Sequence, residues 1–187
     1  MAIYSKIILF TLAGLFISYS NAQTNISWKE HIIDDSSVGP PDLAGSDGLV
    51  MADLDKDGHL DIVSVHELDT EYGVPEGYVR IAWGSQDPLE WTSTTLASGS
   101  EAPSAEDVDV ADADGDGWLD IVVACELAHL IYFQNPGKNH RSVRWERTVP
   151  KSTLNRGSFI RVFFSDLDGD GRVEVVTANK GGENASG

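Results

Sequence analysis

The same acidic motif, followed directly by an apolar run, occurs three times in this chain. It reads DLDKDGHLDIV at 53–63, DADGDGWLDIV at 112–122 and DLDGDGRVEVV at 166–176. One acidic turn can arise by chance, but three copies within one frame indicate an internal structural repeat. The repeat restricts the possible folds more than any other feature of the sequence.

Short apolar segments recur around each motif. One segment precedes the motif (GLVMA, VDVA or IRVFFS), and one follows it (LDIVSV, LDIVVA or VEVVTA). The first two copies of the repeat also have a third segment, at 78–84 and 129–134. A tryptophan lies upstream of each motif, as Trp28, Trp91 and Trp145. The segments are rich in Val, Ile and aromatic residues and are bounded by Gly, Pro, Asp or Asn, which is typical of strands.

Four strands in about 55 residues are typical of one blade of a β-propeller. A β-sandwich with evenly spaced strands is the alternative, but it would not restore the same loop at the same phase. We therefore predict an all-β fold, a β-propeller of four-stranded antiparallel blades. Its parts are an outer strand at 26–33, blade 1 at about 47–96, blade 2 at about 106–149 and an incomplete blade 3 at about 158–187.

This arrangement amounts to about two and three-quarter blades. Complete propellers typically have four to eight blades, and open sheet edges are avoided in natural proteins. We expect the chain to be a fragment of a longer protein. The alternative is a short chain that closes its propeller by oligomerising.

The N-terminus resembles a secretory signal peptide. Lys6 precedes an apolar run at 7–17, and a small-residue segment ending at Ala22 follows. The run is too short to span a bilayer, which makes a membrane anchor the weaker alternative, and no later segment is apolar enough to span one. We predict a signal peptide at 1–22, cleavage after Ala22, and a secreted, periplasmic or cell-surface protein.

The chain is strongly acidic, with a net charge of −17 that becomes −18 when Lys6 leaves with the signal peptide. This charge argues against nucleic acid and anionic membranes as partners and suits a cation-binding extracellular protein. Cys125 is the only cysteine, so no intramolecular disulfide can form. It lies in the apolar run IVVAC, where we expect a buried structural thiol.

Each acidic loop places carboxylates at its positions 1, 3, 5 and 9 and a glycine at position 6. The carboxylates are Asp53, Asp55, Asp57 and Asp61; Asp112, Asp114, Asp116 and Asp120; and Asp166, Asp168, Asp170 and Glu174. Backbone carbonyls at position 7 are further candidate ligands, from His59, Trp118 and Arg172. Hard oxygen donors in this number suit Ca²⁺, whereas Mg²⁺ keeps more water and uses fewer carboxylates. We predict about three calcium sites.

The alternatives to a structural calcium loop are a solvated acidic turn and an EF-hand. Position 12, which is glutamate in an EF-hand, is Ser64, Val123 or Thr177 here, and the flanking segments are strands. No helix pair is therefore available to open and signal. A structural role for the metal is favoured over a catalytic or sensing one, because calcium would cross-link a chain that has no disulfides.

These units resemble FG-GAP/VCBS-type repeats, the calcium-loop blades of integrin α-chain propellers and of many bacterial secreted proteins. The resemblance rests on DxDxDG followed by an apolar strand and covers residues 26–187. It implies that the loop carboxylates bind calcium between the first two strands of each blade. Glu174 departs from the usual Asp, and the absence of Phe-Gly and Gly-Ala-Pro signatures favours the bacterial type.

Candidate ligand-binding residues lie outside the loops. Glu67 and Glu126 each follow the first loop aspartate by 14 residues, and Lys180 takes this place in the third unit. Asp107, Asp109 and Arg161 lie on the expected innermost strands, where they could line an axial channel. Turn charges and inter-blade ion pairs are the alternative interpretation.

A basic segment stands out from the acidic chain. Seven of the 13 Lys and Arg residues lie between 138 and 161, and among them Arg141, Arg144 and Arg147 are candidates to bind a sulfated or carboxylated polysaccharide. A solvated outer-strand face is the alternative. His66, His129 and His140 show no metal-ligand spacing and are interpreted as structural or surface residues.

Two classes of function remain open from sequence. The first is an exported, calcium-stabilised module that binds a polysaccharide or a cell-surface protein. The second is a polysaccharide-degrading enzyme, since some lyases resemble this architecture. We favour binding, because the sequence has no G-x-S-x-G motif, no zinc motif and no activated cysteine.

Overall fold

The structure of the protein, a computed structural model, describes residues 27–68, 75–154 and 156–181. The chain divides into a short unit at 1–30 and a main unit at 31–187. The described part of the short unit, 27–30, contains neither strand nor helix. The predicted signal peptide at 1–22 lies outside the described residues.

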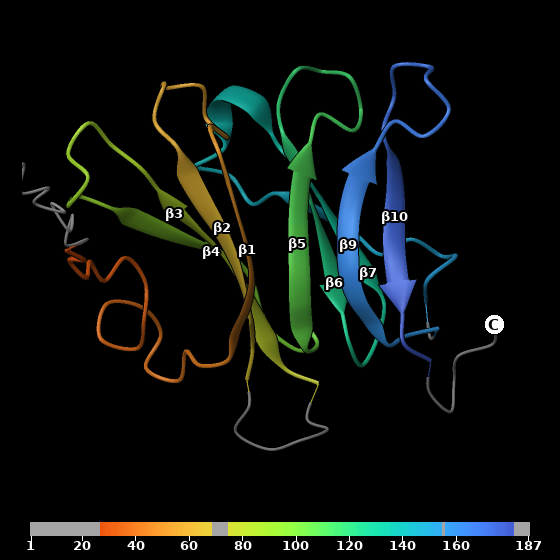
Figure 1. The fold of residues 1–187 in the computed structure, drawn as a ribbon, viewed down its shortest axis with the longest axis horizontal. Coiled ribbons are helices and arrows are strands. Elements are labelled where there is room, and N and C mark those ends of the chain that lie inside the picture. Colours follow the sequence, from red (N-terminus) through yellow and green to blue (C-terminus); the bar gives the residue numbers. More distant parts are fainter. Residues whose placement is uncertain (1–26, 69–74, 155, 182–187) are drawn as a thin grey trace, which may run out of the picture. The chain divides into compact units, whose positions relative to one another are not determined.

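The described residues of the main unit form three antiparallel sheets in which each strand pairs with the next one along the chain (Figure 1). Sheet 1 consists of β1 (Ser46–Ala52), β2 (Asp61–Glu67), β3 (Gly77–Trp83) and β4 (Thr92–Gly99). Sheet 2 consists of β5 (Ala105–Ala111), β6 (Asp120–Cys125), β7 (Leu130–Gln134) and β8 (Glu146–Thr148). Sheet 3 consists of β9 (Phe159–Ser165) and β10 (Glu174–Asn179). A 3₁₀ turn, η1 (Gly137–Asn139), precedes β8.

The expected all-β class is confirmed, since the described residues contain no α-helix. The strand-rich ranges expected at 47–96 and 106–149 correspond to sheet 1 at 46–99 and sheet 2 at 105–148. The described part of the third range contributes the two strands of sheet 3. None of the described residues forms a helix long and apolar enough to cross a membrane.

The outer strand expected at 26–33 is not found, because residues 27–33 form no strand in the structure. A strand needs a neighbour with free backbone N–H and C=O groups. The third strands, β3 and β7, are already paired on both sides, β3 with β2 and β4 and β7 with β6 and β8. The described residues therefore offer no third strand to which 27–33 could be added.

Sheet 2 packs on both of its faces, and β6 shows why. All six of its residues are buried. Ile121, Val123 and Cys125 belong to a core shared with Val63, Val65, Val79 and Ile81 of sheet 1. Val122 and Ala124 belong to a second core with Phe159 and Val162 of sheet 3. Because successive side chains of a strand point to opposite faces, the continuous apolar run IVVAC fills both interfaces at once.

The buried thiol expected at Cys125 is confirmed. The residue is fully buried and reduced. Burial raises its pKa to about 12, because the apolar surroundings disfavour the thiolate. Cys125 is therefore a packing residue rather than a nucleophile.

The segment that leads into β1 covers the β3 part of the sheet 1 face opposite sheet 2. Arg80 of β3 forms an ion pair with Asp34, whose Oδ1 accepts a hydrogen bond from Nη2 at 3.0 Å. Tyr78 donates its hydroxyl to Asp42 Oδ1 at 2.8 Å, and Leu43 is buried. Desolvation lowers the pKa of the neighbouring His66 imidazole. This segment is therefore anchored to sheet 1 by one buried ion pair and one exposed hydrogen bond.

Candidate metal centre

The three acidic loops connect the first and second strands of each sheet, and they lie at the same end of the three sheets (Figure 1). Their backbones have the same conformation. Position 4 has a positive φ in each loop, at Lys56 (60°), Gly115 (82°) and Gly169 (78°). The glycine at position 6 of each loop also has a positive φ, between 87° and 90°. A φ near 80–90° is readily adopted only by glycine, which explains its recurrence, whereas Lys56 at 60° lies in the left-handed helical region that other residues enter at some cost.

The carboxylates at positions 1, 3 and 5 fold back onto the loop backbone. Position 1 accepts the N–H of the glycine at position 6, from Gly58 at 3.0 Å in the first loop and Gly117 at 2.9 Å in the second. Position 3 accepts the N–H of position 5, and position 5 accepts that of position 7, in all three loops. These short-range bonds hold alternate side chains toward one centre.

The structure brings three carboxylates of each loop together. In every group, one oxygen of each residue lies within 4.8 Å of the others. The groups are Asp53, Asp55 and Asp57; Asp112, Asp114 and Asp120; and Asp166, Asp168 and Glu174. Positions 1 and 3 are common to the three groups, whereas the third member is position 5 in the first loop and position 9 in the other two.

Position 9 has a structural task that the sequence interpretation missed. Asp61 is fully buried, and its two oxygens accept the N–H groups of Leu54 and Gly84, both at 2.9 Å. Asp120 is also fully buried and accepts three hydrogen bonds, two of them from the N–H groups of Ala113 and Asn135. Burial raises the pKa of both carboxyls. Position 9 thus joins the loop to the residue that follows the third strand.

The third loop repeats only part of this arrangement. Glu174 Oε2 accepts the N–H of Leu167 at 2.7 Å, as the aspartates do in the other loops. Glu174 is half-buried rather than buried, and sheet 3 has no third strand among the described residues. The longer glutamate side chain at position 9 therefore keeps the hydrogen bond to the backbone N–H at position 2 of the loop.

The donor set fits calcium. Each group offers only carboxylate oxygens, and none contains a thiolate or an imidazole. Two oxygens bound to one Ca²⁺ at about 2.3–2.6 Å lie at most about 5 Å apart. A separation of 4.8 Å or less is compatible with that limit. The carbonyls of His59, Trp118 and Arg172 would add to the set, and the N–H bonds of these residues hold position 7 against the loop.

The loop and the strands around it match a known family. The family model of the FG-GAP-like repeat matches residues 68–123, from the end of β2 into β6. The chain carries an FG-GAP-like repeat. The matched range is about one period of the internal repeat and includes the complete second acidic loop. No curated protein matches the chain in sequence.

The loops of this FG-GAP-like chain differ in what surrounds them. In the first, Arg141 contacts Asp55 and Asp57, and His140 Nε2 lies 3.5 Å from Asp55 Oδ2. In the second, Asp114 accepts a hydrogen bond from the neutral amide of Gln134. In the third, the described partners of the aspartates all belong to the loop itself. Lys56 Nζ lies 4.4 Å from the Trp118 ring centroid in the second loop, but among the described residues only the first loop has aspartates that form an ion pair with a basic side chain.

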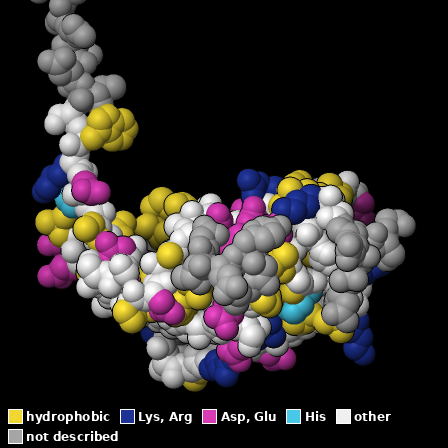
Figure 2. All heavy atoms as spheres, turned by 90° about the horizontal axis from the view of Figure 1, so that it is seen from below, with side chains coloured by type: hydrophobic (Ala, Val, Ile, Leu, Met, Phe, Trp, Pro, Cys, Tyr) yellow, Lys and Arg dark blue, Asp and Glu magenta, His cyan; other side chains and the backbone are white. Residues whose placement is uncertain are grey.

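Glu67, Glu126 and Lys180 occupy equivalent places, at the end of the sheets opposite the loops. Their N–H groups donate to the carbonyl that lies just before the first strand of the same sheet, at 2.8, 2.8 and 3.0 Å. Glu126 and Lys180 form an ion pair. Figure 2 shows this end from below, where acidic and basic side chains form separate small groups among hydrophobic ones.

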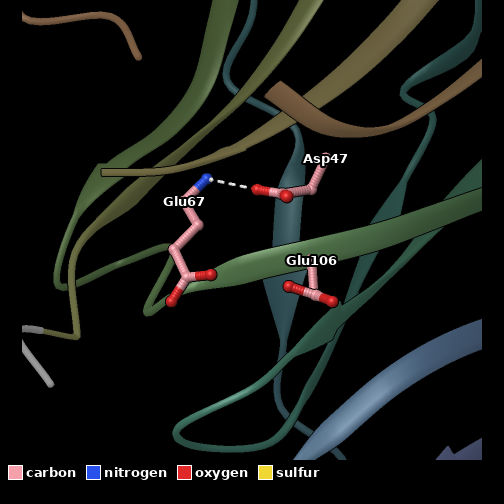
Figure 3. A group of neighbouring side chains, drawn as sticks. All are labelled: Asp47, Glu67 and Glu106. Carbon is pink, nitrogen blue, oxygen red and sulfur yellow. Dashed lines mark hydrogen bonds between the residues drawn. The ribbon is translucent and has the colours of Figure 1, made fainter. Parts of the chain in front are cut away.

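Glu67 faces other acids. Its carboxylate lies near those of Asp47 and Glu106, with one oxygen of each within 4.8 Å, and its N–H donates to Asp47 Oδ2 at 3.3 Å (Figure 3). Burial and then the charge of Asp47 raise the pKa of the Glu106 carboxyl, and Arg161, 3.7 Å away, opposes the shift. The negative charge at this end is therefore partly balanced by Arg161.

Two aspartates that were expected to line a channel accept hydrogen bonds from the next sheet instead. Asp107 Oδ2 accepts the N–H of Val162 at 2.9 Å, and Asp109 Oδ2 accepts that of Phe164 at 2.8 Å. Both donors lie on β9, whose edge toward β5 has no strand partner. The carboxylates supply the acceptors that a neighbouring strand would otherwise provide.

The basic candidates already have partners within the chain. Arg144 donates to Glu101 Oε1 at 2.7 Å, and Arg147 Nε donates to the Glu101 carbonyl at 3.0 Å. Arg141 and Arg144 line a surface groove of ≈ 470 Å³ between β4 and the segment that leads into β8. Hydroxyl side chains share the groove, from Thr94, Thr95, Ser98 and Ser142.

Proposed function

We propose that this chain is an exported, calcium-binding β-propeller module that recognises acidic polysaccharides. The observation that carries the proposal is the threefold recurrence of one loop conformation, each copy gathering three carboxylates. The predicted signal peptide at 1–22 supports export. The FG-GAP-like repeat supports the assignment of the loops to propeller blades.

The packing of the sheets supports a propeller. The first strands β1, β5 and β9 lie side by side, as the innermost strands of successive blades do (Figure 1). Leu49 and Met51 of β1 are 63% and 50% exposed, and Phe163 of β9 is 48% exposed. The residues of sheet 2 that correspond to Leu49 and Met51 pack against sheet 1. Sheets 1 and 3 thus carry apolar outer faces suited to a series of packed blades.

Calcium would act as a structural cross-link. In each loop it would neutralise carboxylates that otherwise repel one another at the turn between two strands. Three bound ions would change the charge of the mature chain from −18 to −12. Since the single cysteine is buried and no disulfide can form, the loops are the natural place for such a cross-link.

Removing calcium is expected to lower the melting temperature. A ligand present at ten times its Kd stabilises the folded state by about 1.4 kcal/mol per site, which corresponds to about 4 °C for a chain of this size. Thermal unfolding should be followed in excess chelator and after restoring millimolar calcium. Asp168→Asn should reduce the calcium-dependent shift by about one third if the sites are similar. Asp87→Asn, in an exposed turn outside the loops, should leave the shift intact. A melting curve that chelator leaves unchanged rules out the metal assignment.

The groove beside β4 is the proposed polysaccharide site. Arg141 and Arg144 provide charge for sulfate or carboxylate groups, and this charge is partly offset by Glu101, which lines the same groove and binds Arg144. Four hydroxyl side chains provide hydrogen bonds for sugar hydroxyls. The groove adjoins the basic segment at 138–161 of an otherwise acidic chain, which reduces the repulsion that an anionic polymer meets there.

Binding should be measured with a sulfated, a carboxylated and a neutral polysaccharide. The acidic polymers should be retained and the neutral one should not. Arg144→Gln should weaken retention by about tenfold, the effect of losing one charged hydrogen bond. Arg156→Gln, an exposed arginine outside the groove, is the matched control. Equal retention of all three polymers contradicts the proposal, and release of unsaturated sugar ends would indicate a lyase instead.

A further inference from the structure

Arg141 contacts two candidate functional elements at once. Its guanidinium binds Asp55, and its Nη2 lies 3.8 Å from Asp57 Oδ2. The same side chain, 42% exposed, lines the groove beside β4 together with Arg144. A single cationic group thus connects a carboxylate loop of sheet 1 with the surface proposed to bind anions.

The position of Arg141 is fixed by the turn around η1. His140 donates its N–H to the Gly137 carbonyl at 3.0 Å, and its ring lies against Trp83 and Trp118, with centroids 5.2 and 6.0 Å away. Asn135, just before this turn, donates to the Leu54 carbonyl inside the first loop at 3.1 Å. A segment of sheet 2 is therefore built onto the loop of sheet 1 and presents Arg141 to it.

The side chain of Asp55 has little capacity left in this arrangement. It is only 4% exposed. Its Oδ1 accepts the N–H of Asp57 at 3.1 Å, and its Oδ2 accepts the Arg141 guanidinium. A cation bound to the first loop would need oxygen of Asp55 and would stand a few ångströms from the guanidinium. The two positive charges would repel and would share one acceptor.

The other loops provide an internal comparison. Asp114, at position 3 of the second loop, has the neutral amide of Gln134 as its side-chain partner. Among the described residues, the partner of Asp168 in the third loop is the backbone N–H of Asp170. Among the described residues, a side-chain cation is therefore ion-paired with loop carboxylates in the first loop alone, and the Lys56 ammonium beside the second loop lies against the Trp118 ring.

We propose that Arg141 exchanges between the first loop and the groove, so that calcium and an acidic polysaccharide bind cooperatively. This inference rests on the proposed function. Without calcium, the guanidinium neutralises Asp55 and Asp57. With calcium in the loop, repulsion favours the conformer in which Arg141 stays in the groove, where it contacts a sulfate or carboxylate. Because coupling between two ligands is reciprocal, the polysaccharide must raise the calcium affinity of the first loop by the same factor.

The test uses calorimetric titration of the full chain with calcium, with and without a sulfated oligosaccharide. In the wild type, one of three sites should be weaker than the others, and saturating oligosaccharide should tighten it about fivefold or more. Arg141→Gln should tighten that site without oligosaccharide and abolish the coupling. Arg141→Lys, which keeps the charge, should leave the site weak. Arg144→Gln should weaken oligosaccharide binding while the calcium affinities stay at their wild-type values.

The outcomes separate this inference from the proposed function. If the wild type binds calcium but Arg141→Gln leaves every calcium affinity unchanged or lowers one, the exchange of Arg141 is refuted and the calcium loops stand. If calcium and oligosaccharide both bind without affecting each other, the coupling is refuted. If the wild type binds no calcium or no acidic oligosaccharide, the proposed function itself fails and the coupling fails with it.

Discussion

Asp120→Ala is expected to lower the free energy of unfolding by about 3–5 kcal/mol. The fully buried carboxylate accepts hydrogen bonds from Ala113 N–H at 3.1 Å, Tyr132 Oη at 2.7 Å and Asn135 N–H at 2.9 Å. Each buried donor left without an acceptor costs about 1–3 kcal/mol, and part of that cost is recovered where water reaches the site. The loss should be measured by urea unfolding in excess chelator, so that calcium binding does not contribute.

Two variants in the same sheet serve as controls for Asp120→Ala. Asp116→Ala removes an exposed loop carboxylate that accepts only the N–H of Trp118, and it should cost less than about 1 kcal/mol. Tyr132→Phe removes one of the three donors to Asp120 and should cost about 1 kcal/mol. If Asp120→Ala costs no more than Asp116→Ala, position 9 is not the anchor that its contacts indicate.

The loops and strands could be predicted because the same sequence pattern occurs three times along the chain. Glycine at position 6 marks a positive φ, and the apolar runs on either side mark the two strands it connects. Position 4 carried the same signal in Gly115 and Gly169, but Lys56 concealed it in the first loop. Comparison of equivalent positions was therefore more informative than the composition of any single segment.

The contacts that distinguish the loops could not be predicted. Arg141 lies 86 residues from Asp55, and Asn135 lies 81 residues from Leu54. No local pattern links residues so far apart, since their proximity depends on how one sheet packs on the next. Charge was the one sequence signal for the contact between Arg141 and Asp55, because Arg141 belongs to the basic segment at 138–161 and Asp55 to an acidic loop.

Position 9 shows how a correct residue can be given an incomplete role. Its carboxylate belongs to the repeated motif, which suggested a metal ligand like the others. Its neighbours in sequence are apolar, and a carboxylate inside a buried strand must be satisfied by hydrogen bonds. Asp61 meets this need with two backbone N–H groups, one of them from Gly84 after the third strand. The apolar neighbours in the sequence, which indicate burial, could therefore have distinguished position 9 from positions 1, 3 and 5.

The second large effect is expected at Arg80, in the ion pair that anchors the segment before β1. The side chains of Arg80 and Asp34 are only 5% and 9% exposed. Arg80→Met should lower the free energy of unfolding by about 3–5 kcal/mol, because it leaves the Asp34 carboxylate buried without its counter-charge. Arg144→Met provides the matched control, since Arg144 and Glu101 are 69% and 50% exposed and such pairs contribute about 0–1 kcal/mol.

A double-mutant cycle decides whether the loss at Arg80 comes from the unpaired charge or from packing. Arg80→Met combined with Asp34→Leu removes both charges and keeps apolar volume, so the double variant should be more stable than Arg80→Met alone. If the loss came only from the missing arginine, the second substitution would restore nothing. A recovery of about 2 kcal/mol or more would assign the cost to the isolated carboxylate. In that case Arg80 holds the segment before β1 in place by neutralising the carboxylate of Asp34, which this segment buries against sheet 1.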